Sequence, residues 1–119
     1  MQGIVRAVAW QRDHFAEIPA LIVPCIQLDG PPAETYRAGL GAGGSIWPAV
    51  QNLLLTARSL GLAGAITTLG LSDRPAAKEV LGLPGEIEPV AIIPVGFPTG
   101  KFGTVTRRPV EDIVRWNRW

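Results

Sequence analysis

The feature that most constrains the fold is a predicted helix over residues 45–61 that has almost no polar face. Ser45 stands at the expected N-cap, Pro48 falls in the first turn, where its missing N–H costs little, and Gly61 follows the last turn. Apolar side chains surround most of this helix: Ile46, Trp47, Val50, Leu53, Leu54, Leu55, Ala57 and Leu60. A helix that is apolar nearly all round is a buried helix, so other structure must enclose it.

The chain is too short to enclose such a helix easily. It has 119 residues, of which 47% are hydrophobic and 18% are charged, which is enough for one domain, 1–119, with a single modest core. Small domains keep a large share of their surface in water, so this much apolar side chain is difficult to bury within one subunit. Two alternatives follow: the chain pairs with a partner, or it is part of something larger.

Composition excludes several classes of protein. The formal net charge of +1 gives no global electrostatic case for nucleic acid, and the one cysteine excludes a disulfide framework and any thiolate metal cluster. A single cysteine also fits a reducing cytoplasm. The longest apolar stretch, residues 20–26, falls well short of the roughly 20 residues that span a bilayer. No secretory signal opens the chain. We therefore expect a cytoplasmic domain that binds neither membrane nor nucleic acid.

Three segments predict strands. Residues 20–28 and residues 90–95 are continuous runs rich in Ile, Leu and Val, which is typical of strands buried on both faces. Pro24 moves the first of these runs towards a sheet edge or a bulge. Residues 63–69 have the β-branched content of a third strand.

Two shorter helices accompany these strands. Residues 4–16 place Val8, Gln11 or Arg12, and Phe15 at helical spacings. Ser72 or Asp73 is expected to cap a short helix that ends before Gly82, because a short polar side chain at the N-cap can accept a hydrogen bond from the first turn. The alternation of strands and helices indicates an α/β or α+β arrangement.

The usual catalytic constellations are absent from the sequence. His14 is the only histidine, and we expect it to be a surface or capping residue. Cys25 lies in an apolar run with no basic neighbour, which favours a buried, inert thiol over a nucleophile. The glycines within residues 39–44 match neither the dinucleotide-binding nor the P-loop spacing. The residues therefore predict no catalytic side chain and no metal site.

Charge is distributed unevenly along the chain. Residues 1–100 hold six basic and eight acidic residues, whereas residues 101–119 hold five basic and two acidic ones, a net charge of +3, together with two tryptophans. The simplest interpretation is a solvated arm whose tryptophans anchor it on the body or on a neighbour. A nucleic-acid surface of interleaved cations and aromatic rings is a weaker alternative. A third is a phosphate site at Arg107 and Arg108.

Three segments in a fixed order resemble a known family. They are GGSIWPAVQNLLLTARSLGLAGAITTLG at 43–70, AAKEVLGLPGEIEPVAIIPVGFP at 76–98 and TRRPVEDIVRW at 106–116. The shared features are an S-x-x-x-A-x-Q-N-L-L-L helix ending in L-G-L, the short strand after it, an L-G-[IL]-P turn, a P-V-G-[FY]-P strand end and a basic R-R-P arm. Each is weak alone, but the five in this order resemble the C-terminal half of the FMN-dependent nitroreductase family. Residues 15–28 resemble its preceding strand more loosely.

The resemblance implies an architecture and an assembly. The family has an α+β fold in which a mixed sheet is flanked by helices. It also implies an intertwined homodimer with one FMN per subunit at the dimer interface. This would explain why the helix over residues 45–61 has no polar face, since the family buries this helix against its mate.

The resemblance also implies which residues contact the flavin. In the family, the backbone after the strand that follows this helix lies against the flavin ring near its reactive nitrogen. The matching positions are Thr67, Thr68 and Leu69, whose backbone N–H groups can stabilise charge on the reduced flavin. The basic residue two positions before the proline contacts the FMN phosphate in the family, and it falls on Arg107, with Arg108 beside it.

Two functions stay open at this stage. In the first, NAD(P)H delivers a hydride to FMN, and the flavin passes electrons to a nitroaromatic, quinone or similar small-molecule acceptor. However, nothing in this chain matches the Arg- and Ser-rich N-terminal segment with which the family holds the flavin phosphate. The second hypothesis is therefore a truncated, non-catalytic relative that acts as a dimerisation or interaction module without cofactor.

Overall fold

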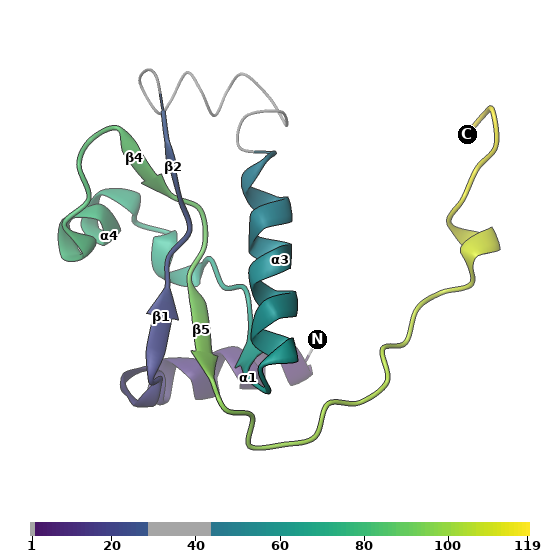
Figure 1. The fold of residues 1–119 in the computed structure, drawn as a ribbon, viewed down its shortest axis with the longest axis horizontal. Coiled ribbons are helices and arrows are strands. Elements are labelled where there is room, and N and C mark those ends of the chain that lie inside the picture. Colours follow the sequence, from purple (N-terminus) through teal and green to yellow (C-terminus); the bar gives the residue numbers. More distant parts are fainter. Residues whose placement is uncertain (1, 29–43) are drawn as a thin grey trace.

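The computed structural model describes residues 2–28 and 44–119 (Figure 1). The helices are α1 (Gln2–Asp13), α3 (Ile46–Ser59) and α4 (Arg74–Leu81). The strands are β1 (Ala20–Ile22), β2 (Cys25–Gln27), β3 (Ala63–Gly64), β4 (Ile87–Pro89) and β5 (Ile93–Gly96). Short 3₁₀ turns lie at Phe15–Glu17, Leu69–Leu71 and Val110–Asp112. The glycine-rich segment 39–43 lies outside the described residues.

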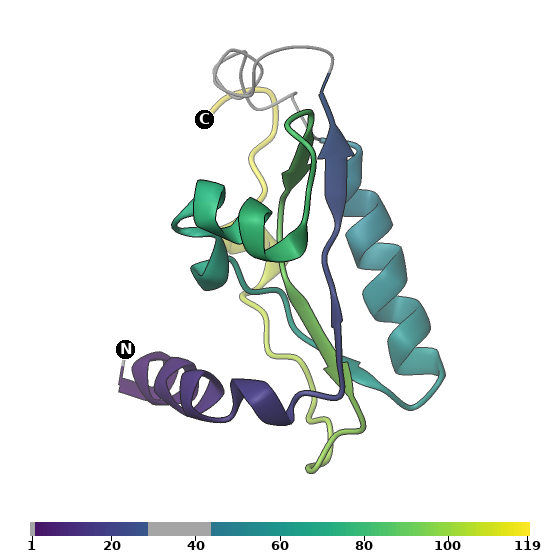
Figure 2. The same ribbon diagram turned by 90° about the vertical axis from the view of Figure 1, so that its left-hand side faces the viewer.

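All strand pairings of the described residues are antiparallel. β5 lies at the centre of a three-stranded sheet with β1 and β3 on either side, and β2 pairs with β4 in a second small sheet. Helix α3 covers one face of the strands and α4 covers the other, while α1 lies across one end (Figures 1 and 2). The predicted α+β class is confirmed.

The apolar run over residues 20–28 forms two strands, where the sequence predicts one. Val23 and Pro24 separate β1 from β2, because a proline has no N–H to donate to a ladder. The Pro24 carbonyl still accepts a hydrogen bond of 2.9 Å from the N–H of Val90. The predicted edge position is confirmed for β1, whereas burial on both faces is wrong for it, because its three residues are all exposed.

The run over residues 90–95 is mostly buried, with Ile92 and Pro94 half-buried, but it is not one strand. β4 ends before it, and β5 begins only at its fourth residue. The four residues Val90, Ala91, Ile93 and Val95 are all buried, and Ile93 is 0% exposed. This segment therefore supplies much of the core even where it leaves the ladder.

The segment 63–69 leaves the sheet earlier than its composition predicts. β3 is only two residues long, and the pairing then continues as a single bridge between Thr67 and Ile92, whose N–H groups each donate to the other's carbonyl at 2.9 and 2.8 Å. Leu69 begins a 3₁₀ turn, so it is not a strand residue. The backbone thus turns away from the sheet at the residues that the resemblance places against a flavin.

Helix α3 ends as predicted but begins without its predicted cap. Gly61 follows the helix with φ of +79°, a left-handed conformation that favours glycine. Ser45 was expected at the N-cap, but its φ of −67° and ψ of −25° are helical, and its side chain makes no capping hydrogen bond. A capping side chain needs an extended backbone to reach the N–H groups of the first turn.

The core lies between α3 and the sheet. It is formed by Val50, Ile93 and Val95, and partly buried residues pack around it: Ile46, Leu53, Leu54 and Leu62. On the outer side of α3, Trp47 is 45% exposed and Leu55 is 58% exposed. Among the described residues, the expected enclosure of the helix is therefore met on the face towards the sheet.

The two shorter helices are confirmed. α1 covers most of the predicted segment, and a 3₁₀ turn continues it to Glu17. Asp73, and not Ser72, caps α4, since its carboxylate accepts a hydrogen bond of 3.1 Å from the N–H of Ala76. Gly82 ends α4 in the left-handed conformation.

A buried carboxylate ties α4 to β4. Glu88 is 3% exposed and accepts a hydrogen bond of 2.6 Å from Nζ of Lys78, while a guanidinium nitrogen of Arg74 lies 3.7 Å from its other oxygen. Arg74 also donates to the Pro89 carbonyl at 2.9 Å. These contacts satisfy the buried charge and fix the helix on this face of the strands.

The predicted C-terminal arm is confirmed. Residues 101–119 are all exposed, and the segment runs away from the body after β5 (Figure 1). One 3₁₀ turn, Val110–Asp112, lies near its end. The arm meets α3 where the guanidinium carbon of Arg58 lies 3.8 Å from the centroid of the Phe102 ring.

Among the described residues, no helix combines the length and apolar character that crossing a bilayer requires.

Candidate functional site

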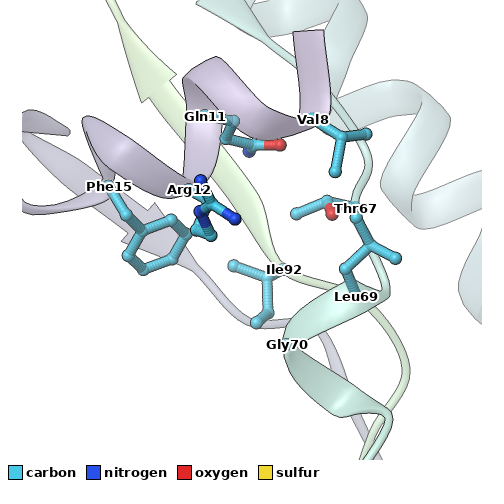
Figure 3. A pocket seen from close by; sticks show the side chains of 8 residues that line it. All are labelled: Val8, Gln11, Arg12, Phe15, Thr67, Leu69, Gly70 and Ile92. Carbon is cyan, nitrogen blue, oxygen red and sulfur yellow. The ribbon is translucent and has the colours of Figure 1, made fainter. Parts of the chain in front are cut away.

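Two of the three residues expected at a flavin ring line an open cavity of about 410 Å³. Thr67, Leu69 and Gly70 approach it from one side and α1 from the other, with Ile92 between them (Figure 3). The volume lies within the range of small-molecule sites, and most of the lining is apolar. The cavity therefore stands where the sheet backbone turns into the 3₁₀ segment.

The wall on α1 was not identified from the sequence. Val8, Gln11 and Arg12 of α1 line this side, together with Phe15 of the 3₁₀ turn that follows it (Figure 3). Their helical spacing in the sequence could have identified this wall, because it places the amide of Gln11 among apolar side chains on a single helix face. The guanidinium of Arg12 is already paired with the Asp13 carboxylate, from which two of its nitrogens lie 2.8 Å away.

Close packing holds the opposite wall in place. A Cβ on Gly70 would lie 2.8 Å from Cδ1 of Ile92, so the backbone here passes nearer to the sheet than a larger residue allows without a shift of that side chain. Leu71 follows with 5% exposure and anchors the turn. The N–H of Thr67, predicted to face the flavin, donates to the Ile92 carbonyl at 2.9 Å, so the N–H groups of Leu69 and Gly70, the first of the 3₁₀ turn, are the candidate donors beside the cavity.

The other predicted site residues do not meet this cavity within the chain. Thr68 is exposed and is not part of the lining, and its carbonyl accepts a 3.0 Å hydrogen bond from the N–H of Leu71. Arg107 and Arg108 lie on the exposed arm, where Nη1 of Arg107 donates to the Thr106 carbonyl at 3.0 Å. The structure thus separates the predicted ring contacts from the predicted phosphate contacts.

His14 has a defined place next to this region. Its Nδ1 donates to the Trp10 carbonyl at 2.8 Å, and the two rings stack with centroids 4.3 Å apart. It stands at the N-cap position of the 3₁₀ turn that begins at Phe15, but its side chain makes no capping hydrogen bond. Together with Gln11 it lines a second cavity of about 390 Å³, so Gln11 borders both cavities.

Cys25 lies in an environment that disfavours the thiolate. The residue is half-buried, and its Sγ donates weakly to the Val23 carbonyl at 3.4 Å. Burial raises the pKa of the Cys25 thiol, and the nearby negative charge of Glu88 raises it further. This agrees with the interpretation of an inert thiol.

Known proteins share this fold. A sequence model of the nitroreductase family matches residues 2–97. A Parabacteroides distasonis protein named as an NADH dehydrogenase/NAD(P)H nitroreductase is 32% identical, with a TM-score of 0.62, over 83% of this chain and 55% of that chain. A Bacteroides thetaiotaomicron protein with the same name is 26% identical, with a TM-score of 0.62, over the same shares of the two chains.

The fold is also that of iodotyrosine deiodinase in a complex with FMN and 3-iodo-L-tyrosine. The sequence identity is 24% and the TM-score is 0.67, over 96% of this chain and 59% of that one. This chain therefore spans little more than half the length of the solved structures it resembles.

Proposed function

Because the chain belongs to the nitroreductase family, as the order of its motifs predicts, we propose that it forms the flavin-ring site of an FMN-dependent oxidoreductase. The observation that carries this proposal is the cavity between α1 and the turn at Leu69 and Gly70. An apolar cavity with free backbone N–H groups at one wall suits a flat aromatic ring that gains negative charge on reduction. Support also comes from iodotyrosine deiodinase, which has this fold and is bound to FMN.

The residues around the cavity fit the ring of this cofactor. FMN, when bound, would supply the chemistry of accepting and donating a hydride or electrons. The N–H groups of Leu69 and Gly70 would hold the electron-rich edge of the ring. The amide of Gln11 would orient it, and the apolar side chains of Val8 and Phe15 would exclude water from it.

The residues of one chain fit the phosphate less well. Arg12 lines the cavity, but Asp13 neutralises its charge. Arg107 and Arg108 carry the charge that a phosphate needs, and they lie on the exposed arm. We therefore propose a homodimer in which the arm of one protomer brings these two arginines to the partner's cavity. The exposed outer side of α3, with Trp47 and Leu55, supports an interface with a second copy.

The electron donor and acceptor are proposed from the family. NAD(P)H is the donor that the name of the Parabacteroides distasonis relative suggests. A small-molecule acceptor such as a nitroaromatic or a quinone suits an open, mostly apolar cavity, into which a flat substrate could stack on the ring.

A second candidate function is a dimerisation or interaction module without cofactor. Arg107 is not among the residues that line the cavity, and this favours the module, because a chain whose arm stays away from the cavity cannot clamp the flavin phosphate. The two candidates differ in whether the purified protein binds FMN.

The deciding experiment is an absorbance spectrum recorded across a size-exclusion peak of the chain with added FMN. Flavin bands that elute with the protein at dimer mass would support the oxidoreductase, and a colourless peak at any mass would support the module. Arg107→Ala should weaken FMN binding roughly ten- to hundredfold, the equivalent of one charge-assisted contact of about 1.5–3 kcal/mol. Arg115→Ala, on the same exposed arm, is the matched control, and an equal loss there would remove Arg107 from the site.

A further inference from the structure

A second cavity lies between the end of α1 and the end of β5. Its volume is about 390 Å³, and one of its sides is formed by Val95 and Gly96 of β5 with Ala63 of β3. Ala63 pairs with Gly96 across the ladder. A Cβ on Gly96 would lie 3.0 Å from Cγ of Pro19, so the strand also packs closely against the segment that leads into β1. This side of the cavity is therefore held by strand pairing and close packing.

Two aromatic rings line the same cavity. Trp10 is 62% exposed and Phe97 is 82% exposed. The His14 imidazole stacks on the Trp10 indole, with centroids 4.3 Å apart and planes 14° apart, and its Nδ1 donates to the Trp10 carbonyl. Because His14 covers one face of the indole, the exposed area includes the opposite face. The face of an indole attracts a cation within about 6 Å of its centre, so Trp10 offers a fixed aromatic face to a positively charged ligand.

The charges at this cavity also favour a cation. Among the described residues of its lining, Glu17 alone carries a formal charge, and none of the ion pairs of the described residues includes it. Because Nδ1 of His14 donates to Trp10, Nε2 of the neutral ring is a hydrogen-bond acceptor. The C-terminal end of α1, which is the negative end of its dipole, lies at the same place. The lining thus combines acceptors with negative charge.

We propose that this cavity binds a small organic cation in which an ammonium group is attached to a flat apolar body. The three N–H donors of an ammonium ion match the carboxylate of Glu17 and the acceptor nitrogen of His14. The apolar body would pack against Trp10, Phe97 and Ile18, and the volume of the cavity suits a small molecule. An anion would instead meet the carboxylate of Glu17 with no positive side chain in the lining to offset it.

A metal ion fits this cavity less well than an organic cation does. Among the described residues, no three His, Cys, Asp or Glu side chains gather closely enough to hold one. Glu17 and His14 alone would leave most of the coordination positions of a metal to water. An organic cation needs fewer polar partners, because the aromatic rings stabilise it as well.

The inference goes beyond the proposed oxidoreductase and does not rest on flavin binding. Gln11 lines both this cavity and the proposed flavin cavity, so the two sites are neighbours. Trp10, His14 and Glu17 line only the second cavity. The experiment can therefore use the full chain without FMN, and its variants leave the lining of the flavin cavity intact.

The test is isothermal titration calorimetry of the full chain with three probes of similar size: 2-phenylethylammonium, the uncharged 2-phenylethanol and the anionic 3-phenylpropionate. We expect the ammonium probe to bind at least about tenfold more tightly than the carboxylate probe, with the alcohol between them. In ¹⁵N NMR spectra, the ammonium probe should shift the indole signal of Trp10 and the amide signal of Thr99. The indole signal of Trp47, on α3, should stay unchanged.

Three variants separate the charge from the aromatic face. Glu17→Gln should weaken binding of the ammonium probe about three- to tenfold and leave that of 2-phenylethanol unchanged, because Glu17 is exposed and only its charge is removed. Glu79→Gln, at an exposed position of α4, is the matched control and should change neither affinity. Trp10→Leu keeps an apolar side chain but removes the aromatic face, so it should weaken binding of the ammonium probe about three- to thirtyfold.

Four results would overturn the proposal: no saturable binding of the ammonium probe at millimolar concentration, equal affinity for the ammonium and carboxylate probes, equal losses from Glu17→Gln and Glu79→Gln, or a shifted amide signal at Leu69 in place of Trp10 and Thr99. The last would assign the probe to the other cavity. An affinity that falls as the chain concentration rises would assign the cavity to a second copy and also overturn the proposal. A chain that binds the ammonium probe but stays colourless with FMN would support this inference while removing the proposed flavin chemistry.

Discussion

The body of the molecule and its C-terminal arm both carry large apolar side chains, but only the body buries them. Ile93 at the centre of the sheet is 0% exposed, whereas Ile113 on the arm is 51% exposed and Trp116 is 82% exposed. The same kinds of residue therefore stabilise one region and are solvated in the other. Among the described residues, the arm therefore stays exposed along its whole length.

An energy estimate also indicates that the contact of the arm with α3 is weak. Its contact with α3, Arg58 against Phe102, is a cation–π pair worth about 0.5–1 kcal/mol at an exposed site. Holding a single residue in one backbone conformation costs about 1–2 kcal/mol, so this contact cannot order residues 101–119. The Cα radius of gyration is 17.1 Å, against about 13–14 Å for a compact chain of this length. Within the described part of the chain, the contact of Phe102 with Arg58 is too weak to fix the position of the arm.

The largest difference between the two regions should appear when the same substitution is made in each. Ile93→Ala should lower the free energy of unfolding by about 2–5 kcal/mol, because the cavity it leaves is fully enclosed. Ile113→Ala should change it by less than about 0.5 kcal/mol. Urea titrations followed by tryptophan fluorescence measure both. Equal losses would show that the arm packs on the body in solution.

A second pair of substitutions compares the removal of a negative charge from the body with its removal from the arm. Glu88→Gln should cost about 1.5–3 kcal/mol, because the ammonium of Lys78 loses the negative charge that pairs with it at a buried site. Glu111→Gln, on the exposed arm, should leave the free energy of unfolding unchanged within error. The same urea titrations apply. A cost at Glu111 as large as that at Glu88 would contradict the view that the arm is solvated.

Local signals in the sequence predicted the helices better than the strands. The carboxylate of Asp73 and the glycines after α3 and α4 act within one turn, so their effect can be read from neighbouring residues. The ends of a strand depend on its partner across the ladder. Pro24 therefore divides a run that looks continuous, and segment 63–69 keeps only two strand residues and one bridge.

The candidate site was half predictable for a similar reason. Thr67 and Leu69 could be placed by resemblance, since the motifs around them are continuous in sequence. Gln11 lies on a different element, and only the folded chain brings it to the same cavity. Arg107 is not among the residues that line that cavity, so its place in the site stays a prediction from the resemblance.

The arm's role in assembly can be measured through its tryptophans. If a second copy receives the arm, Trp116→Ala should weaken self-association roughly thirtyfold, the effect of losing about 2 kcal/mol at a central aromatic contact. Trp10→Ala is the matched control, since Trp10 is 62% exposed but lies on α1 and stacks on His14. Sedimentation over a range of concentrations measures the association. Equal weakening by both variants would leave the arm without a special role.

The smallest difference should appear in how the reactivity of a thiol depends on pH, with Cys25 representing the body and an introduced cysteine representing the arm. Burial and the charge of Glu88 raise the pKa of the Cys25 thiol, so the folded body binds this proton more tightly than the unfolded chain does. The resulting stabilisation is complete below the ordinary thiol pKa and is lost as the pH rises through the raised value. Because the thiolate is the reactive form, Cys25 should react with iodoacetamide more slowly than an ordinary thiol in mildly alkaline solution.

A thiol on the arm provides the matched comparison. Val105→Cys, made in a Cys25→Ala background, places a cysteine at a position that is 66% exposed, and it should react with the rate profile of a free thiol. Glu88→Gln should speed the reaction of Cys25 by less than about tenfold, because it removes the second of two causes and leaves burial in place. If Cys25 and the arm thiol reacted at the same rate across the pH range, then β2 would be as solvated as the arm, and the division of the molecule into a packed body and an unpartnered arm would be wrong at that strand.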